Sequence, residues 1–336
     1  MFLKNINLSL SNRCNASCIW CPTSRGTKHN FDMPWEIAKK IIDELADQPE
    51  HIKMIHVSEN GEALYNPDFL KIVRYIKEKL PSTAVNLLSN FGLVTEEMSR
   101  ALLSEKLLSS LQVNIDGHDA DSYKAVKGIS YTSVIRNVKT FLKLREEFDP
   151  EFNFQINVMP AFEYAYTVST FFHAPPDRAK DPIPYSDFDI SVESLRQFVP
   201  ENVRITHSKS GFWAERKLVA AGKIKLPVDQ KTLSCPLLGR VETEAFIAPN
   251  GDWYPCCLDD NNDIVLGNVV ESTIMEILHS EKRKDFLTKL RAKQFEEIGY
   301  PCNTVVCCQT ITMNETDFKN RTGHFKKGDV LILKQE

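Results

Sequence analysis

Several features that define other protein classes are missing from this sequence of 336 residues. No apolar run approaches the ~18 residues that a membrane-spanning helix needs, and the N-terminus has neither the basic nor the apolar segment of a secretory signal. The 41 Lys and Arg residues and the 45 Asp and Glu residues are scattered, without a basic stripe. This distribution argues against a nucleic-acid partner. We therefore expect a cytoplasmic protein with neither a membrane nor a nucleic-acid partner.

Cysteine is absent from the long middle of the chain, between Cys21 and Cys235. All nine cysteines fall into three groups, one near the N-terminus and two in the last third of the chain. Such clustering in a reducing compartment indicates metal or redox chemistry rather than a disulfide framework. The groups are Cys14, Cys18 and Cys21; Cys235, Cys256 and Cys257; and Cys302, Cys307 and Cys308.

The remaining composition is that of a globular protein, with 42% hydrophobic and 26% charged residues. The length fits one large barrel-type domain plus a smaller module. In the first half, stretches with a strand pattern alternate with stretches with an amphipathic helix pattern, which favours βαβ units and a parallel sheet or barrel. We expect strands over 5–11, 52–57, 84–88, 111–115 and 152–159, and helices over 33–47, 67–80, 95–104 and 133–146.

This rhythm weakens after residue 160. The proline-rich stretch 173–184 predicts a loop, and 202–207 is a candidate for a last strand. A second module begins near Cys235, where two short strands flank the turn 249–252, because Asn-Gly is a strong hairpin signal. One helix is expected over 271–292.

Polar residues follow the predicted strands at the points where they end. Ligands of parallel α/β folds bind at this edge, and the first cysteine group shares it. Each residue alone would be an ordinary turn former, but their recurrence on one rim predicts a site. They are Glu59, Gly61 and Glu62; Ser89 and Asn90; Asn114 and Asp116; and Asn157 and Met159.

The segment "SNRCNASCIWCP" at 11–22 places three thiols within eight residues. A cubane iron–sulfur cluster has four irons that each need an outside ligand, so three cysteines would leave one iron open to bind another molecule. A structural zinc site closed by a fourth ligand such as His29 is the alternative.

The cysteine spacing Cys-x3-Cys-x2-Cys, with Trp20 before the last cysteine, resembles the signature of the radical S-adenosylmethionine (radical SAM) superfamily. "NGEALYNPDF" is similar to that family's Gly-Gly-Glu segment, with Asn60 in place of the first glycine. "LLSNFG" resembles its Thr-Asn-Gly element, and "VNIDG" its Ser-hydrophobic-Asp-Gly element, with Asn114 in place of serine. The resemblance covers residues 5–160. It implies a cofactor-binding set of Trp20, Asn60, Gly61, Glu62, Ser89, Asn90, Asn114, Asp116 and Asn157.

The resemblance implies a partial (β/α)6-type barrel and a definite chemistry. Cys14, Cys18 and Cys21 would hold a 4Fe-4S cluster whose open iron binds SAM. Reductive cleavage of SAM would give a 5′-deoxyadenosyl radical that abstracts hydrogen from an unactivated C–H bond. A reductant such as flavodoxin or ferredoxin would supply the electron.

The second cysteine group also resembles a known module. Cys235, Gly251-x4-Cys256 and "YPCCLDDNNDIVLGNV" are similar to the SPASM and twitch modules, which bind auxiliary iron–sulfur clusters. We expect one auxiliary 4Fe-4S cluster held by Cys235, Cys256, Cys302 and Cys308, with Cys307 as the alternative to Cys308. A structural zinc site is the alternative hypothesis for these cysteines. The expected organisation is a radical SAM partial barrel over 1–225, a small α+β SPASM/twitch module over 226–320 and a tail over 321–336.

Cys257 is left over from these ligand sets. A free cysteine often packs as a small hydrophobic residue. A thiol beside a substrate radical could instead donate a hydrogen atom, which would give epimerisation. An auxiliary cluster near the substrate could alternatively accept an electron, which would give net two-electron dehydrogenation.

The cluster loop starts at residue 14, which leaves no room ahead of it for the leader-binding domain of many peptide-modifying relatives. We therefore expect a small polar substrate such as a sugar, aminocyclitol or nucleoside. Glu59, His207 and Arg216 are candidate substrate contacts, although a solvated charged face would explain His207 and Arg216 equally well.

Three functions follow from these patterns. The first is oxidation or rearrangement of a small polar molecule, with 5′-deoxyadenosine as a product and about eight irons per chain. The second is a peptide maturase or epimerase, which a short precursor gene nearby would favour. The third is a non-catalytic zinc- or iron–sulfur-stabilised binding protein, which would not cleave SAM.

Overall fold

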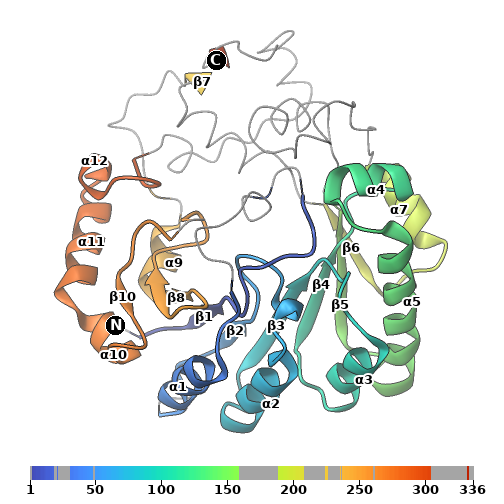
Figure 1. The fold of residues 1–336 in the computed structure, drawn as a ribbon, viewed down its shortest axis with the longest axis horizontal. Coiled ribbons are helices and arrows are strands. Elements are labelled where there is room, and N and C mark those ends of the chain that lie inside the picture. Colours follow the sequence, from blue (N-terminus) through green and yellow to red (C-terminus); the bar gives the residue numbers. More distant parts are fainter. Residues whose placement is uncertain are drawn as a thin grey trace.

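Nine strands in the described part of the chain form one sheet, in the order β10-β9-β8-β1-β2-β3-β4-β5-β6 (Figure 1). Strands β1 to β6 pair in parallel with their neighbours. Their bounds are β1 Asn5–Leu8, β2 Met54–His56, β3 Ala84–Ser89, β4 Ser110–Asn114, β5 Asn153–Val158 and β6 Arg204–His207. The computed structural model describes residues 2–18, 21, 31–47, 50–158, 188–207, 224–225, 235, 237–259, 262–303 and 331–332.

Helices cover the outer face of this parallel sheet (Figure 1). Strand residues on that face, such as Ile6, Val85 and Leu111, are fully buried. The predicted helix stripes face them: Ala38, Ile41, Ile42 and Leu45 of α1 are buried, as are Phe69, Ile72, Val73 and Ile76 of α2. The helix bounds are α1 Trp35–Ala46, α2 Phe69–Lys79, α3 Glu96–Ser104, α4 Ala120–Lys127, α5 Tyr131–Phe148 and α7 Phe188–Arg196, with a 3-10 turn η2 at Ala63–Tyr65.

The parallel half agrees with the partial barrel expected from the sequence. The candidate strand at 202–207 is present as β6, paired with β5. Two helices of this half were not expected, α7 and α4. Helix α4 begins at a capping box formed by Asp119 and Ser122 and ends at Gly128, whose φ of 75° lies in the left-handed region. Its short length gives a weak periodic signal, whereas its two caps are readable in the sequence.

The C-terminal part extends the same sheet. Strand β8 (Glu244–Ile247) pairs in parallel with β1, and β9 (Asp252–Tyr254) forms the predicted hairpin with β8. Strand β10 (Gly267–Asn268) pairs with β9, and β7 (Ile224–Lys225) pairs separately with β11 (Leu331–Ile332). The remaining helices are α9 Leu238–Thr243, α10 Ile274–His279, α11 Glu281–Arg291 and α12 Phe295–Ile298.

The single helix predicted over 271–292 is wrong in one respect, because the structure divides it into α10 and α11. Ser280 ends the first helix and caps the second, accepting a hydrogen bond from the Arg283 backbone N–H at 3.2 Å. The buried Arg283 side chain then donates to the carbonyls of Leu278, Val241 and Glu242 at 2.9–3.3 Å. The break therefore allows α11 to be fastened to α9.

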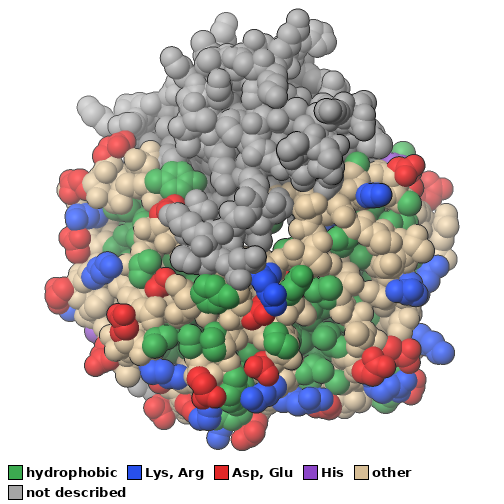
Figure 2. Space-filling view, viewed as in Figure 1, with side chains coloured by type: hydrophobic (Ala, Val, Ile, Leu, Met, Phe, Trp, Pro, Cys, Tyr) green, Lys and Arg blue, Asp and Glu red, His purple; other side chains and the backbone are tan. Residues whose placement is uncertain are grey.

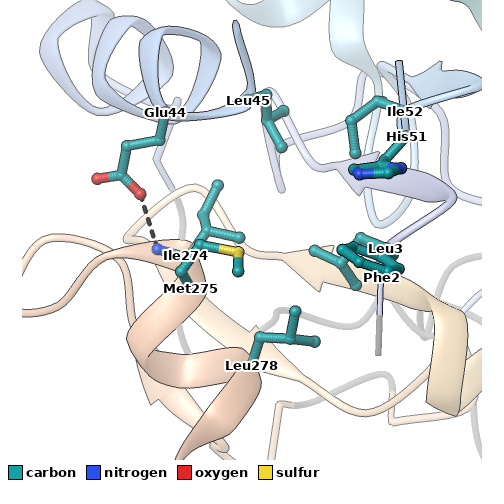
Figure 3. Close-up of a pocket in the computed structure, with 9 residues that line it drawn as sticks. All are labelled: Phe2, Leu3, Glu44, Leu45, His51, Ile52, Ile274, Met275 and Leu278. Carbon is teal, nitrogen blue, oxygen red and sulfur yellow. Dashed lines mark hydrogen bonds between the residues drawn. The ribbon is translucent and has the colours of Figure 1, made fainter. Parts of the chain in front are cut away.

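A small apolar cleft lies where α1 meets α10 (Figure 3). Its wall includes Leu3 and Ile52, which precede β1 and β2, so it opens where the parallel strands begin. At its rim, Glu44 accepts a hydrogen bond from the Ile274 backbone N–H at 2.7 Å. The cysteine loop follows the opposite end of β1, so this cleft belongs to the joint between the two parts of the chain and not to the candidate site.

Acidic and basic side chains are interspersed over the described part of the face in Figure 2, as the sequence suggested. Among the described residues, no helix has both the length and the apolar character needed to span a membrane.

Candidate active site at the carboxyl ends of the parallel strands

The first cysteine group lies directly beyond β1, at the carboxyl edge of the sheet. Cys14, Cys18 and Cys21 are all half-buried, and the Cys21 backbone N–H donates to the Cys18 carbonyl at 3.1 Å. Burial, with smaller contributions from the neighbouring Glu62, Cys18 and Cys21, raises the pKa of the Cys14 thiol to about 12, although a hydrogen bond from the Ala16 backbone N–H opposes the rise. The loop thus brings three thiols into one electrostatic neighbourhood. Trp20 lies outside the described residues.

The two ends of the cysteine loop are fastened together at its base. Arg13 pairs with Asp32, and the Ser11 hydroxyl donates to the same carboxylate at 2.6 Å. Ser11 and Asp32 also form an isolated β-bridge. The guanidinium of Arg13 lies over the ring of Tyr65, 4.3 Å from its centroid. We call this arrangement of Ser11, Arg13, Asp32 and Tyr65 the loop clamp.

The turn after β2 packs directly on the backbone of this loop. The Glu62 backbone N–H donates to the Arg13 carbonyl at 2.8 Å. A Cβ atom on Gly61 would lie 2.3 Å from the Ser11 carbonyl oxygen, and its φ of 97° also disfavours a side chain. Glycine at position 61 is therefore required by close approach. Asn60 beside it is half-buried.

The carboxylate of Glu62 is buried and held by three donors. The Ser89 hydroxyl and the Asn90 backbone N–H each donate at 2.8 Å, and the Leu64 N–H donates at 3.4 Å. Burial raises the pKa of Glu62, and these hydrogen bonds oppose the rise. Asn90 also donates through its side chain to Asn15 at 2.8 Å and to the Cys14 sulfur at 3.6 Å. Asn90 therefore connects Glu62 to the cysteine loop, and Ser89 helps to fix the Glu62 carboxylate.

Asp116 is fully buried beyond β4 and pairs with Lys127. The Lys127 ammonium donates to the Asp116 carboxylate at 2.8 Å, and the exposed fractions of the two side chains are 5% and 0%. The Lys127 carbonyl accepts a hydrogen bond from the Ser17 backbone N–H at 2.8 Å. This ion pair thus lies under the cysteine loop, a placement that the sequence pattern did not predict.

The face of the sheet opposite the helices carries polar side chains in register. Asn7, His56 and Asn86 are successive partners across β1, β2 and β3. Further along, Gln112 pairs with Gln155, and the next row contains Asn114, Asn157 and Thr206. Since side chains alternate along a strand, these residues share one face. Apart from the buried Asn7 and Asn157, they are half-buried, and Leu88 on the same face is 42% exposed. We call this surface the inner polar face.

This face was missed at the sequence level, apart from Asn114 and Asn157. The signal was present as a polar residue at every second position of "NINLS", "LQVN" and "FQINV". Each of these stretches predicts a strand, but the alternation by itself does not indicate what the polar side chains face.

Arg240 connects the C-terminal part to the inner polar face. Its guanidinium donates to both oxygens of Glu244 at 2.9–3.1 Å, and Glu244 also accepts from Asn5 and Asn7. Burial alone would raise the pKa of Glu244, but the hydrogen bonds from Arg240 and Asn7 outweigh it and hold that pKa below its usual value. Arg240 Nη1 also donates to the sulfur of Cys257 at 3.9 Å.

Glu59 lies next to this cluster and is not held by a hydrogen bond within the described part of the chain. Burial raises the pKa of its carboxyl to about 7, while the positive charge of Arg240 opposes the rise and Glu244 adds to it. Burial also lowers the pKa of His56 on the same face. Glu59 can therefore exchange a proton near neutral pH. Of the other predicted substrate contacts, His207 is described only as the last residue of β6, and Arg216 lies outside the described residues.

Four cysteines of the C-terminal groups are described. Cys256 and Cys302 are buried in the hydrophobic core, and Cys235 and Cys257 pack against it. Burial raises the pKa of Cys235. Cys307 and Cys308 lie outside the described residues, so the structure does not decide between them.

Within the described ranges, no three His, Cys, Asp or Glu side chains form a group that could hold a metal ion. A cubane differs from a single ion because each thiol bonds a separate iron, so its ligands surround a group instead of converging on a point. Three thiols on one clamped loop, with an amide donor on Cys14, have the donor chemistry that such a cluster requires. The residues present are therefore compatible with a cubane, and the ligand sets remain predictions.

Comparison with family models gives two matches. The model of the radical SAM superfamily matches residues 8–161, and the model of the SPASM iron–sulfur cluster-binding domain matches residues 235–309.

Curated relatives match shorter segments. A tungsten-containing aldehyde ferredoxin oxidoreductase cofactor-modifying protein of Pyrococcus furiosus is 31% identical over 30% of this chain and 27% of its own length. GTP 3′,8-cyclase of Lactiplantibacillus plantarum is 27% identical over 41% of this chain and 42% of its own. Mycofactocin maturase MftC of Mycobacterium tuberculosis is 28% identical over 35% of this chain and 29% of its own length. The matched segments span less than half of each of these relatives.

Solved structures match over most of the chain. BtrN in complex with AdoMet and 2-DOIA has a TM-score of 0.55 at 15% identity, covering 91% of this chain and 94% of BtrN. Streptococcus suis SuiB bound to S-adenosylmethionine has a TM-score of 0.53 at 14% identity, covering 83% of this chain and 66% of SuiB. At these identities the similarity shows a shared fold.

Proposed function

Because the chain belongs to the radical SAM superfamily and carries a SPASM iron–sulfur module, we propose that it abstracts a hydrogen atom from a small polar substrate bound at the inner polar face. Family membership makes the protein an enzyme, so the non-catalytic binding protein considered from the sequence is set aside. Its cofactors are SAM and a 4Fe-4S cluster, together with auxiliary iron–sulfur binding in the SPASM module.

We assign the first cluster to Cys14, Cys18 and Cys21, and an auxiliary 4Fe-4S cluster to Cys235, Cys256, Cys302 and either Cys308 or Cys307. When bound, SAM and the first cluster supply a radical able to remove hydrogen from an unactivated C–H bond. The polypeptide's own task is to orient the target carbon and to exclude water. The assigned barrel and module boundaries, 1–225 and 226–320, belong to the same proposal.

Among the rim residues, Glu62 is the proposed acceptor for the amino group of SAM. Its carboxylate is fixed by Ser89 and Asn90, and Asn90 is bonded to the cysteine loop. The carboxylate is therefore already oriented relative to Cys14 before any ligand arrives. Asn60, Gly61, Asn114, Asp116 and Asn157 complete the proposed set on the same rim, with Trp20 from the loop.

The inner polar face is the observation that favours a small polar substrate. A barrel interior filled with side chains would be apolar, whereas this one presents amides at half-buried positions, including Gln112 and Gln155. Amide groups can both donate and accept hydrogen bonds, which suits a ligand with several hydroxyl or amino groups. BtrN, whose structure holds 2-DOIA, covers a similar length of chain. We assign Glu59, whose pKa is raised by burial, to proton exchange with such a ligand.

A peptide-modifying activity is the second candidate. One curated relative is a mycofactocin maturase, and SuiB has been crystallised bound to the precursor peptide SuiA. In this case the substrate would be a segment of another polypeptide, and the inner polar face would receive one side chain of it.

Transfer of deuterium from substrate to 5′-deoxyadenosine separates the two candidates. The reduced enzyme is incubated with SAM and perdeuterated cyclitols, amino sugars or nucleosides, and in a parallel experiment with deuterated peptides. The 5′-deoxyadenosine that forms is then analysed by mass spectrometry. We expect the mass of 5′-deoxyadenosine to increase only with a member of the small-molecule set. Deuterium arriving only from peptides would overturn the small-substrate proposal and support the second candidate.

A further inference from the structure

A buried polar group lies beneath the cysteine loop, on the side of its middle thiol. It consists of Asp116 and Lys127, which form an ion pair at 2.8 Å, and of Tyr123 from the intervening helix α4. The hydrogen bond from the Ser17 N–H to the Lys127 carbonyl attaches this group to the loop one residue before Cys18.

The hydroxyl of Tyr123 is the unusual member of this group. The side chain is fully buried, yet its oxygen has no hydrogen-bond partner within the described part of the chain. The residue cannot readily move away, because its backbone packs against Gly117, where an added Cβ would lie 2.6 Å from the Tyr123 nitrogen. Its ring also packs against Tyr131, with the centroids 5.4 Å apart.

Four ionisable groups, Lys127, Asp116, Cys18 and Tyr131, are electrostatic neighbours of Tyr123. Burial raises the pKa of Tyr123; Lys127 opposes this rise, and Asp116 and Cys18 add to it. Cys18 likewise raises the pKa of Lys127, so the middle thiol is an electrostatic neighbour of both residues. The ammonium of Lys127 is already paired with Asp116, whereas the hydroxyl is still available as a donor.

A buried hydroxyl without a partner destabilises a fold, and phenylalanine would fill the same space without that cost. A partner that is not part of the polypeptide would resolve this. The proposed cluster is the group expected on the Cys18 side of the loop, and its thiolate and sulfide sulfurs accept hydrogen bonds.

We infer that the Tyr123 hydroxyl donates a hydrogen bond to the first cluster on its Cys18 side and thereby raises the reduction potential of that cluster. The reduced cluster carries one more negative charge, so a donor stabilises it more than the oxidised form. This inference rests on the ligand role of Cys18 assigned above. Tyr123 is thus a positioning and tuning residue, distinct from the ligands.

The test is a potentiometric titration of the full-length Tyr123→Phe enzyme, in which electron paramagnetic resonance monitors the reduction of each cluster. The first cluster is identified as the signal that changes when SAM is added. We expect the potential of this signal to shift to more negative values in the variant, with unchanged iron per chain and an apo-protein melting temperature equal to or above that of the wild type. The auxiliary-cluster signal in the same sample serves as an internal control and should not shift.

Tyr131→Phe is the matched variant, because it removes the hydroxyl of the neighbouring ring, which contacts Ser194 at 3.5 Å instead. It should leave the SAM-responsive potential unchanged. An unchanged potential in Tyr123→Phe would overturn this inference alone, as would a loss of iron or of apo-protein stability, because the hydroxyl would then have a structural partner. A wild-type protein without any SAM-responsive signal would contradict the proposed function itself.

Discussion

Glu59 and Glu62 lie three residues apart in one turn, but their carboxylates have different surroundings. Glu62 accepts three hydrogen bonds from residues at or near the ends of its neighbouring elements and is fixed in place. Burial and the charge of Arg240 act in opposite directions on the pKa of Glu59, whose carboxyl makes no hydrogen bond within the described part of the chain. The first carboxylate is therefore suited to holding a ligand, and the second to exchanging a proton.

The raised pKa of Glu59 predicts a pH-dependent stability. The folded protein keeps a proton on this carboxyl up to about pH 7, whereas an ordinary glutamate, with a pKa of 4.5, releases it earlier. Between these two pKa values the folded state binds more protons than the unfolded state. Ionisation of Glu59 therefore lowers the free energy of unfolding as the pH rises, and this loss of stability is complete above about pH 7. Glu59→Gln removes this loss. We expect the apo variant to gain melting temperature relative to the wild type between about pH 5 and about pH 8.

Glu59→Asp serves as the control, because it keeps a carboxylate and should keep the pH dependence. Melting curves of the three proteins that remain parallel across this range would show that the Glu59 carboxyl titrates like an exposed one.

At the scale of elements, the loop clamp prepares the cysteine loop for its ligand. The chain between Ser11 and Asp32 is closed at its base by one carboxylate that receives both Arg13 and the Ser11 hydroxyl. The Phe31 backbone N–H also donates to the Asn12 side chain at 2.8 Å. Closing a loop in advance reduces the conformational entropy that is lost when its thiols bind a common group.

Loosening this clamp should weaken cluster retention. Asp32→Asn removes the charge that pairs with Arg13, and we expect iron to be lost to a chelator about tenfold faster, at the lower end of the effect of outer-shell partners on metal affinity. Absorbance at the cluster band, followed over time under anaerobic conditions, measures this rate.

Asp43→Asn is the matched control. Asp43 of α1 also receives a cation and a hydroxyl, from Lys39 and Tyr75, but it lies away from the cysteine loop. Equal rates of iron loss in both variants would show that the loop clamp has no part in holding the cluster.

Most elements could be predicted from the sequence because their patterns are local. The stripes of α1 and α2 and the Asn-Gly turn between β8 and β9 each follow from a few adjacent residues. The break at Ser280 was missed because the apolar stripe was read through it, although a serine followed by glutamate can start a helix.

The long-range polar contacts of the site could not be predicted in the same way. The hydrogen bond from Asn7 to Glu244 joins residues 237 positions apart and exists because β8 pairs with β1. Likewise, Lys127 reaches Asp116 only because the unpredicted helix α4 turns back under the loop. The rim residues could be found because strand ends converge in any parallel sheet, whereas such partners depend on the particular packing.

At the scale of the whole molecule, one sheet joins both iron–sulfur regions. The first cysteine group follows β1, and Cys256 follows β9, which is separated from β1 only by β8. Arg283 fastens α11 to α9, and Lys40 of α1 donates to the carbonyls of Val269 and Ser272. The C-terminal part is therefore built onto the edge of the barrel, and the inner polar face reaches from β1 to β6 beside it.

We propose that a cluster on Cys14, Cys18 and Cys21 cleaves SAM. Measuring 5′-deoxyadenosine after anaerobic reconstitution with iron and sulfide, and reduction with dithionite in the presence of SAM, tests this proposal. We expect 5′-deoxyadenosine with the wild type and with Cys257→Ser, and none with Cys18→Ala. A Cys18→Ala protein that forms 5′-deoxyadenosine at the wild-type rate would contradict it.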